Sequence, residues 1–170
     1  MKNPLLVNAL ELLRRPGSVK RITIEVDPLD IGLESRVLAS GSPLEVDVSV
    51  ESLSDGLVVT GSLRARFAAE CRRCLCPIEG IVEADVRELY QVTVTDPDAF
   101  PIVGDQVDLV PMVRESVLLE LPDAPVCRPD CAGLCPICGI DRNVASCTCV
   151  VDTPDPRWAA LEGLREQLPE

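Results

Sequence analysis

The nine cysteines of this chain limit its possible folds more than any other feature of the sequence. An odd number leaves one thiol over under any disulfide pairing, and closely spaced cysteine pairs are the kind that bind metal. Because the sequence has no histidine, a zinc site would have to be built from thiolates, with or without a carboxylate. The lack of histidine also excludes histidine acid/base chemistry and catalytic triads. Metal ligation is therefore our first expectation.

Two four-thiolate sites are expected. Cys135-Pro136-Ile137-Cys138-Gly139 is a C-x2-C turn of the kind whose backbone amides point at sulfur, and Cys147-Thr148-Cys149 is its natural complement. The predicted zinc ligands are Cys71, Cys74, Cys127 and Cys131 in site one, and Cys135, Cys138, Cys147 and Cys149 in site two. Three residues separate the two sets, so at most about 14 Å of chain lies between them and the two ions should be neighbours. Cys76 is left over as a buried thiol.

Spacing leaves three alternatives open. The pairs could be exchanged, so that Cys71/Cys74 join Cys135/Cys138 while Cys127/Cys131 join Cys147/Cys149. An iron–sulfur cluster uses overlapping cysteine spacings. A C-x2-C redox dithiol is the third alternative, although no βαβ pattern surrounds either pair. We take two zinc ions as the predicted cofactors.

Hydrophobic periodicity predicts an α+β fold, with an antiparallel β-sheet or meander and packed helices. Strands are expected at residues 21–26, 44–51, 57–70 and 81–94, a short helix after Asn8, a longer helix from Asp108 to Pro122, and a final helix from Asp155. The segments 57–70 and 81–94 should pair, because both alternate on either side of the cysteine loop. Cys71 and Cys74 are therefore expected at a hairpin tip.

The chain divides into two parts at Pro122. Residues 1–121 are predicted to form the α+β core, which carries the Cys71/Cys74 knuckle. Residues 122–170 are predicted to form a zinc-binding cysteine-rich segment with a C-terminal helix, packed on the same domain. Within 122–150 there is little hydrophobic periodicity, so something other than an apolar core must order the chain, and bound metal would do so.

The net charge of −12 argues against a general nucleic-acid binder, whose affinity comes from cations that replace the counterions of phosphates. Two four-thiolate zinc sites would bring the folded protein to about −16. A basic protein partner or a local basic patch fits better. Six arginines near the tip and the cysteines are candidates for contacting a partner: Arg64, Arg66, Arg72, Arg73, Arg128 and Arg142. The alternative is that they form a solvated rim that balances thiolate charge.

Catalysis, a small-molecule substrate and a membrane location are not expected. A catalytic zinc needs an open coordination position and a base, whereas two complete thiolate sets describe closed sites. No apolar run approaches the roughly 18 residues of a membrane span, and residues 1–15 lack the apolar run of a signal peptide. We therefore expect a cytoplasmic protein that is not an enzyme.

Four segments occur in an order that is typical of one family. They are Glu70-Cys71-Arg72-Arg73-Cys74, Asp108-Leu109 ahead of Leu119-Glu120-Leu121-Pro122, the run from Cys131 to Gly139, and Asp155-Pro156-Arg157-Trp158-Ala159-Ala160-Leu161. In these segments the chain resembles the YceD family of bacterial proteins linked to accumulation of large-subunit ribosomal RNA, in the longer cysteine-rich form found in actinobacteria. Shorter relatives lack the cysteine run after Gly133, so the second site would be a stabiliser and not the element the family shares.

The resemblance implies a factor for 23S rRNA accumulation and assembly of the large ribosomal subunit. Its partner would be a large-subunit ribosomal protein or precursor rRNA, and zinc would serve as a scaffold. A second hypothesis is a zinc-stabilised protein-interaction adaptor outside ribosome biogenesis, which would use the strand edge at residues 21–26. A thiol redox protein is the third.

Overall fold

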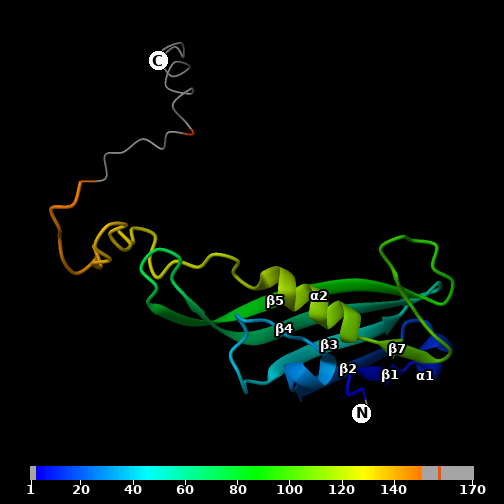
Figure 1. The fold of residues 1–170 in the computed structure, drawn as a ribbon. Coiled ribbons are helices and arrows are strands. Elements are labelled where there is room, and N and C mark those ends of the chain that lie inside the picture. The colour runs from blue at the N-terminus through cyan, green and yellow to red at the C-terminus, as the bar shows by residue number, and fades with distance from the viewer. Residues whose placement is uncertain (1–2, 151–156, 158–170) are drawn as a thin grey trace, which may run out of the picture.

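A five-stranded sheet crossed by one long helix makes up most of the fold (Figure 1). The structure is a computed structural model and describes residues 3–150 and Arg157. The final helix expected from Asp155 lies outside the described residues. None of the helices within them combines the length and the apolar character that crossing a membrane requires.

The strands of the main sheet lie in the order β2-β3-β4-β5-β6, and all neighbours are antiparallel except β5 and β6, which run parallel. Their bounds are Val19–Val26, Leu44–Ser52, Leu57–Glu70, Pro77–Gln91 and Phe100–Pro101. Two more strands, β1 (Leu6–Asn8) and β7 (Gln106–Asp108), pair separately. The helices are α1 (Leu10–Leu13), the 3-10 helix η1 (Pro28–Ile31) and α2 (Val110–Glu120). This architecture confirms the predicted α+β class with an antiparallel meander.

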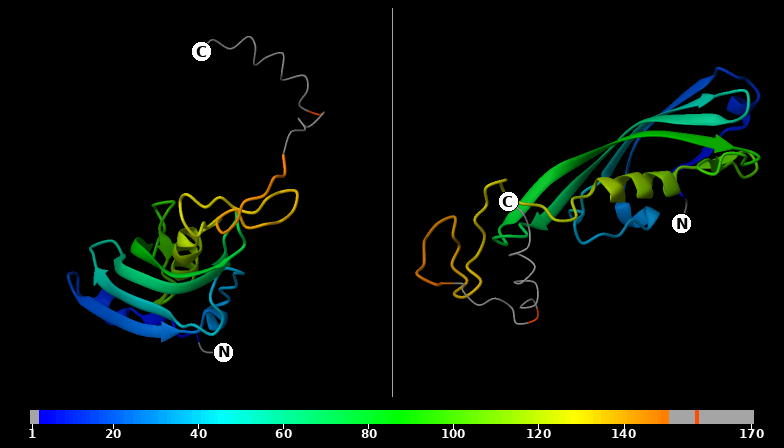
Figure 2. Two further views of the ribbon diagram at one scale, coloured as in Figure 1. Left: turned by 90° about the vertical axis from the view of Figure 1, so that its left-hand side faces the viewer. Right: turned by 90° about the horizontal axis from the view of Figure 1, so that it is seen from above.

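One face of the sheet is buried beneath α2, while no helix of the described residues crosses the other face (Figure 2). The alternating residues of β3 from Leu44 to Val50 on the buried face are at most 1% exposed. Met112, Val113 and Val117 of α2 pack into the same core. Aromatic side chains are few, so aliphatic residues at strand and helix periods fill this core.

The predicted β5 is shifted by several residues from the observed one. The observed strand begins at Pro77 and not at residue 81, because its pairing with β4 continues to the hairpin tip, where Glu70 lies opposite Pro77. It ends at Gln91, not residue 94, because the side-chain oxygen of Gln91 accepts hydrogen bonds from the N–H groups of Thr95 (3.0 Å) and Asp96 (3.2 Å). A side chain that bonds the backbone beyond it favours a turn over a continuing strand.

Gly61 of β4 permits a close approach to β3. A Cβ atom at this position would overlap the carbonyl oxygen of Asp47, which is rigid backbone and has no room to move aside. We expect Gly61→Ala to lower the free energy of unfolding by about 2 kcal/mol, measured by urea denaturation. Ser62→Ala, one residue along on the opposite face, is the control and should change it little. Equal stability of both variants and the unmodified protein would contradict the close-approach argument.

The β4–β5 hairpin extends toward the cysteine-rich segment, which is coloured yellow to orange in Figure 1. Residues 122–150 contain no helix or strand in the structure, only an isolated bridge between Leu134 and Asp141. A small apolar cluster of Cys71, Cys74 and Cys131 lies here, separate from the main core. The division of the chain at residue 122 stays a prediction.

Candidate metal centres

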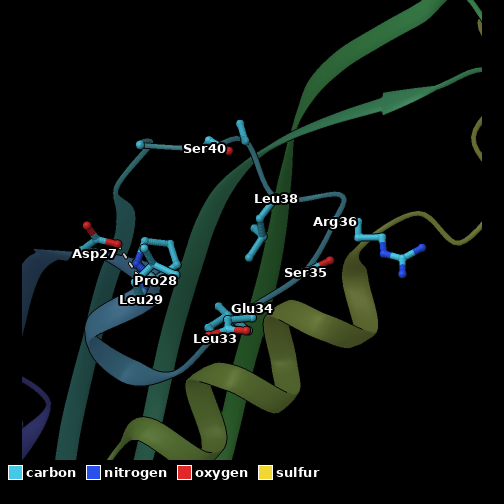
Figure 3. Close-up of a pocket in the computed structure, with 11 residues that line it drawn as sticks. Asp27, Pro28, Leu29, Leu33, Glu34, Ser35, Arg36, Leu38 and Ser40 are labelled. Atoms are coloured by element: carbon cyan, nitrogen blue, oxygen red, sulfur yellow. Dashed lines mark hydrogen bonds between the residues drawn. The ribbon is translucent and has the colours of Figure 1, made fainter.

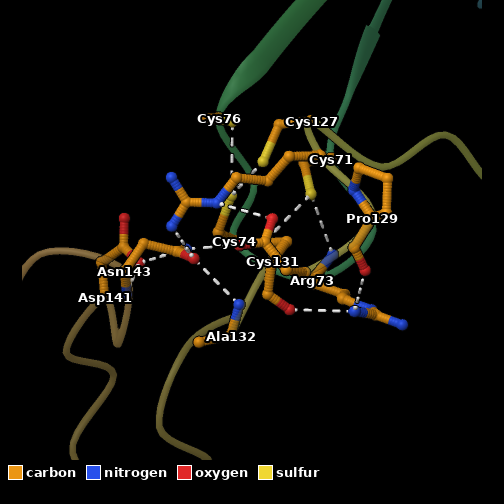
Figure 4. A network of polar contacts seen from close by, with 12 residues as sticks. Cys71, Arg73, Cys74, Cys76, Cys127, Pro129, Cys131, Ala132, Asp141 and Asn143 are labelled. Carbon is orange, nitrogen blue, oxygen red and sulfur yellow. Dashed lines mark hydrogen bonds and ion pairs between the residues drawn. The ribbon is translucent and has the colours of Figure 1, made fainter.

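The tip of the β4–β5 hairpin is held by the segment that follows α2 (Figure 4). Two backbone hydrogen bonds join them: the N–H of Arg72 donates to the carbonyl of Pro125 (2.9 Å), and the N–H of Leu134 donates to the carbonyl of Arg73 (2.9 Å). Gly133 sits so close to the carbonyl of Arg73 that a Cβ atom there would lie 2.9 Å from its oxygen. The tip and the segment therefore form one packed unit.

Five thiols gather where the tip meets this segment. The sulfurs of Cys71, Cys74, Cys76 and Cys127 lie within 4.8 Å of one another. The sulfur of Cys131 lies 3.8 Å from that of Cys71, and the sulfur of Cys74 lies 3.7 Å from that of Cys127 and 3.3 Å from that of Cys76. The four sulfurs that all lie close together thus include Cys76 in place of the predicted Cys131, whose sulfur lies beside the group next to that of Cys71. Which four residues form site one stays a prediction.

The second cluster comprises the four residues predicted for site two. The sulfurs of Cys135, Cys138, Cys147 and Cys149 lie within 4.8 Å of one another. The exchanged pairing, in which Cys135 and Cys138 would join the hairpin tip, is not the grouping that these distances give. Both clusters could hold a metal ion.

The two C-x2-C turns share one hydrogen-bond pattern. In the first turn, the N–H of Cys71 donates to the carbonyl of Cys76 (2.8 Å), and the N–H of Leu75 donates to the carbonyl of Cys71 (2.9 Å). In the second turn, the N–H of Cys135 donates to the carbonyl of Ile140 (2.8 Å), and the N–H of Gly139 donates to the carbonyl of Cys135 (2.9 Å). Leu75 and Gly139 both have positive φ, 61° and 73°. Cys76 therefore occupies the position that Ile140 occupies in the second turn.

Backbone N–H groups acidify the leading cysteine of each turn. Burial disfavours the Cys71 thiolate, but N–H groups including that of Cys127 outweigh it and lower the pKa of Cys71 to about 5. The N–H of Cys138 is the main cause that lowers the pKa of Cys135 to about 6. In the same cluster, a hydrogen bond with the Cys138 thiol, together with burial, raises the pKa of Cys149 to about 12. Each turn therefore offers a ready thiolate for a cation.

Asn143 organises the loop around the first cluster, and sequence reasoning missed it. Its side-chain oxygen accepts from the guanidinium of Arg128 (2.7 Å) and from the N–H of Ala132 (2.8 Å). Its amide nitrogen donates to the sulfur of Cys131 (3.4 Å) and to a carboxylate oxygen of Asp141 (2.6 Å). Burial raises the pKa of Cys131, but the Asn143 bond contributes to a net lowering. No spacing rule marks such a residue, because its role depends on the folded loop.

Three of the six arginines predicted to contact a partner also bond within the fold. Arg64 pairs with Glu83 (2.8 Å) and Glu45 (3.5 Å), Arg73 donates to the carbonyls of Pro129 (3.3 Å) and Cys131 (2.9 Å), and Arg128 bonds Asn143 and lies 3.4 Å from Asp130. The other three, Arg66, Arg72 and Arg142, are exposed, and their side chains make no ion pair within residues 3–150. That any of the six arginines contacts a partner stays a prediction.

A hollow of about 590 Å³ lies beside η1, away from any cysteine (Figure 3). Leu29, Leu33 and Leu38 give it apolar walls. Two of its polar side chains bond the local backbone: Asp27 accepts from the N–H of Leu29 (2.9 Å), and Ser35 accepts from a nearby N–H (3.2 Å). The hollow is also lined by Glu34, Arg36 and Ser40.

Two sulfur–sulfur distances in the first cluster fit a tetrahedral ion. Four sulfurs bound to one zinc at about 2.3 Å lie about 3.8 Å from one another. The distances from Cys71 to Cys131 (3.8 Å) and from Cys74 to Cys127 (3.7 Å) match that edge. The 3.3 Å between Cys74 and Cys76 is shorter than the edge requires.

The comparisons with known proteins agree on one family. The sequence profile described as "Large ribosomal RNA subunit accumulation protein YceD" matches residues 59–165, from β4 through both cysteine clusters. The chain belongs to the YceD family. An uncharacterized protein of Mycobacterium tuberculosis is 38% identical over 94% of this chain and 80% of its own length.

More distant YceD relatives come from other lineages. A chloroplastic protein of Arabidopsis thaliana, described as "Large ribosomal RNA subunit accumulation protein YCED homolog 1", is 25% identical over 75% of this chain and 50% of its own length. The uncharacterized protein YlbN of Bacillus subtilis is 29% identical over 74% of this chain and 76% of its own length. No solved structure matches the chain.

Proposed function

We propose that this protein is a non-enzymatic factor for 23S rRNA accumulation and assembly of the large ribosomal subunit, and that it acts by binding a basic large-subunit ribosomal protein. The family match carries the proposal, because it spans the long hairpin and the whole cysteine-rich segment and so includes the parts that pack together. Closed thiolate clusters, with no histidine in the sequence, support a structural and not a catalytic use of metal.

The proposed cofactors are two zinc ions. Site one would be held by Cys71, Cys74, Cys127 and Cys131, and site two by Cys135, Cys138, Cys147 and Cys149. The distances from Cys71 to Cys131 and from Cys74 to Cys127, both near a tetrahedral edge, support this set. The shared turn pattern supports leaving Cys76 outside it, since the equivalent position in the second turn is an isoleucine. Closed four-thiolate coordination would make both ions scaffolds that hold the segment on the hairpin tip.

Charge favours a basic protein over bare rRNA as the partner. The hairpin tip (residues 70–76) and the segment 122–150, together called the cysteine end, carry equal numbers of arginines and carboxylates. The arginines are Arg72, Arg73, Arg128 and Arg142, and the carboxylates are Glu70, Asp123, Asp130 and Asp141. Two four-thiolate zinc sites would leave this end at about −4. A negative surface attracts a basic protein and repels phosphates, so the same surface would also shield a basic ribosomal protein from non-specific RNA contact.

Affinity purification from growing cells tests the proposal directly. A tagged full-length chain should recover a basic large-subunit ribosomal protein, and ribonuclease treatment should leave that protein bound because RNA does not bridge the two. Rising salt should release it, since the attraction is electrostatic. Identification of the bound proteins by mass spectrometry and of bound RNA by sequencing is the measurement.

Arg72 and Arg142 give rRNA binding as the second candidate, because their exposed guanidinium groups could meet phosphates. If rRNA is the direct partner, Arg72→Ser/Arg142→Ser should lower RNA recovery and reduce the slope of binding against salt by about 2, whereas Arg87→Ser on β5 should not. That result would replace the ribosomal protein with rRNA as the partner. Recovery of neither component would favour an interaction adaptor outside ribosome biogenesis.

A further inference from the structure

Strand β2 forms an open edge of the main sheet. It pairs with β3 along one side over Val19–Val26, and no other described strand lies along its other side (Figure 2). The strand is eight residues long and contains no proline or glycine. Natural proteins usually shorten, bend or cover such an edge, because unpaired N–H and C=O groups can accept another strand.

The direction of the free backbone groups follows from the neighbouring bonds. Leu53 of the β3–β4 turn donates its N–H to Gly56 (2.9 Å), and Ser52 donates its N–H to Ser18 (2.9 Å). The backbone N–H and C=O groups of odd-numbered β3 residues therefore point toward β4, and those of even-numbered residues point toward β2, since the two directions alternate along an antiparallel strand. In β2 the even residues then face β3, which leaves the backbone groups of Arg21, Thr23 and Glu25 pointing outward from the sheet.

The side chains along this edge are complementary to themselves. If a second β2 ran antiparallel with the two-fold axis at Thr23, Arg21 would lie opposite Glu25 of the partner subunit, and Glu25 opposite the partner subunit's Arg21. Ile22 would lie opposite the partner subunit's Ile24 on the other face, and both isoleucines are only half-buried in the single chain. A two-fold interface needs this kind of self-matching, because the same patch is used on both sides.

Arg21 has hydrogen-bond donors to spare for such a contact. It already holds Asp47 through Nε (3.2 Å) and Nη2 (2.8 Å), which fixes the guanidinium above the open face. A guanidinium has five N–H donors, so donors remain for a second carboxylate. The side chain is 72% exposed, and no other acidic residue of the described chain pairs with it.

We propose that two copies of this chain associate through β2, joining their sheets across a two-fold axis at Thr23. About six backbone hydrogen bonds, from Arg21, Thr23 and Glu25 of each copy, would close the edge. The Arg21–Glu25 pairs fix the register, and the isoleucine pairs exclude water from the inner face. The contact lies on the opposite edge of the sheet from β5 and β6 and uses none of the cysteines.

Sedimentation velocity of the zinc-loaded full chain over a concentration series tests this contact. The unmodified protein should dimerise reversibly. Arg21→Glu and Glu25→Arg should each raise the dimer dissociation constant about tenfold or more, because both opposite-charge pairs become like-charge pairs. An equimolar mixture of the two variants should form a heterodimer, in which every pair is again of opposite charge. Arg87→Glu makes the same charge change on β5 and should leave the dissociation constant unchanged.

Three results would overturn the proposal. They are a monomer at all concentrations, a dimer unaffected by either reversal, and single variants that do not associate when mixed. Arg21→Glu removes the Arg21–Asp47 ion pair and could disturb the fold, whereas Glu25→Arg leaves that pair intact and so tests the contact independently. Circular dichroism should show the same folded content for both variants as for the unmodified chain.

Discussion

Cys135→Ser should disorder residues 122–150 while the main sheet stays folded. Cys135 leads the second turn, and its thiolate is the one most favoured by backbone N–H groups in that cluster. Structural zinc in small domains contributes roughly 10 to 16 kcal/mol of coupled binding and folding, far more than the sparse apolar contacts of this segment. Zinc content should fall from about two to about one ion per chain, and protease cleavage in the segment should increase strongly.

Hydrogen exchange separates this local loss from global unfolding. Amides of 122–150 should exchange rapidly in Cys135→Ser, while those of β3 and the buried part of β4 stay protected, because their core does not depend on the cysteines. Ser146→Ala is the matched control, an exposed residue of the same segment, and should keep both ions and the native cleavage pattern. A segment that stays protected and protease-resistant without its second ion would show that metal does not order it.

The sheet could be predicted from the sequence because its signals are local. The strict alternation in β3 separates a buried face from an exposed face, and a turn at Ser54 to Gly56 joins it to β4. The pairing of β4 with β5 was predictable because only six residues separate the two strands. The end of β5 was missed, because the side chain of Gln91 stops the strand through bonds that no propensity describes.

The cysteine end was harder to predict, because its details depend on residues far apart in sequence. The grouping of the second cluster follows from nearness along the chain. The first cluster joins a hairpin tip to a segment more than fifty residues later, and only the folded turn shows that Cys76 points into it. Nothing in the sequence indicated the positive φ at Leu75, because a residue in that conformation is usually a glycine, as it is at Gly139.

The six arginines predicted to contact a partner differ in whether they also bond within the chain. The sequence offered six arginines as one patch, but carbonyls and carboxylates of the chain already use Arg64, Arg73 and Arg128. Arg73 in particular holds the cysteine-rich segment on the tip, so its substitution would alter the fold and would not report on a partner. Spacing alone cannot separate these roles, since both need an arginine beside a loop.

Cys131→Ser should release the ion of site one, whereas Cys76→Ser should retain it. The sulfur of Cys131 lies at the tetrahedral edge distance from that of Cys71, is almost fully buried, and receives a hydrogen bond from Asn143, as metal ligands commonly do from neighbouring polar groups. Loss of this ligand should lower zinc content by about one ion and weaken zinc affinity at that site by several orders of magnitude. Competition with a chromophoric chelator measures both quantities.

Cobalt substitution distinguishes the ligand sets at site one. Four thiolates around cobalt give intense tetrahedral absorption bands, which should persist in Cys76→Ser and decrease by about half in Cys131→Ser as one of two sites is lost. The opposite outcome, with Cys131→Ser keeping both ions and Cys76→Ser losing one, would assign site one to Cys71, Cys74, Cys76 and Cys127. Cys131 would then be the spare thiol, and the shared pattern of the two turns would have no bearing on which sulfurs hold the metal.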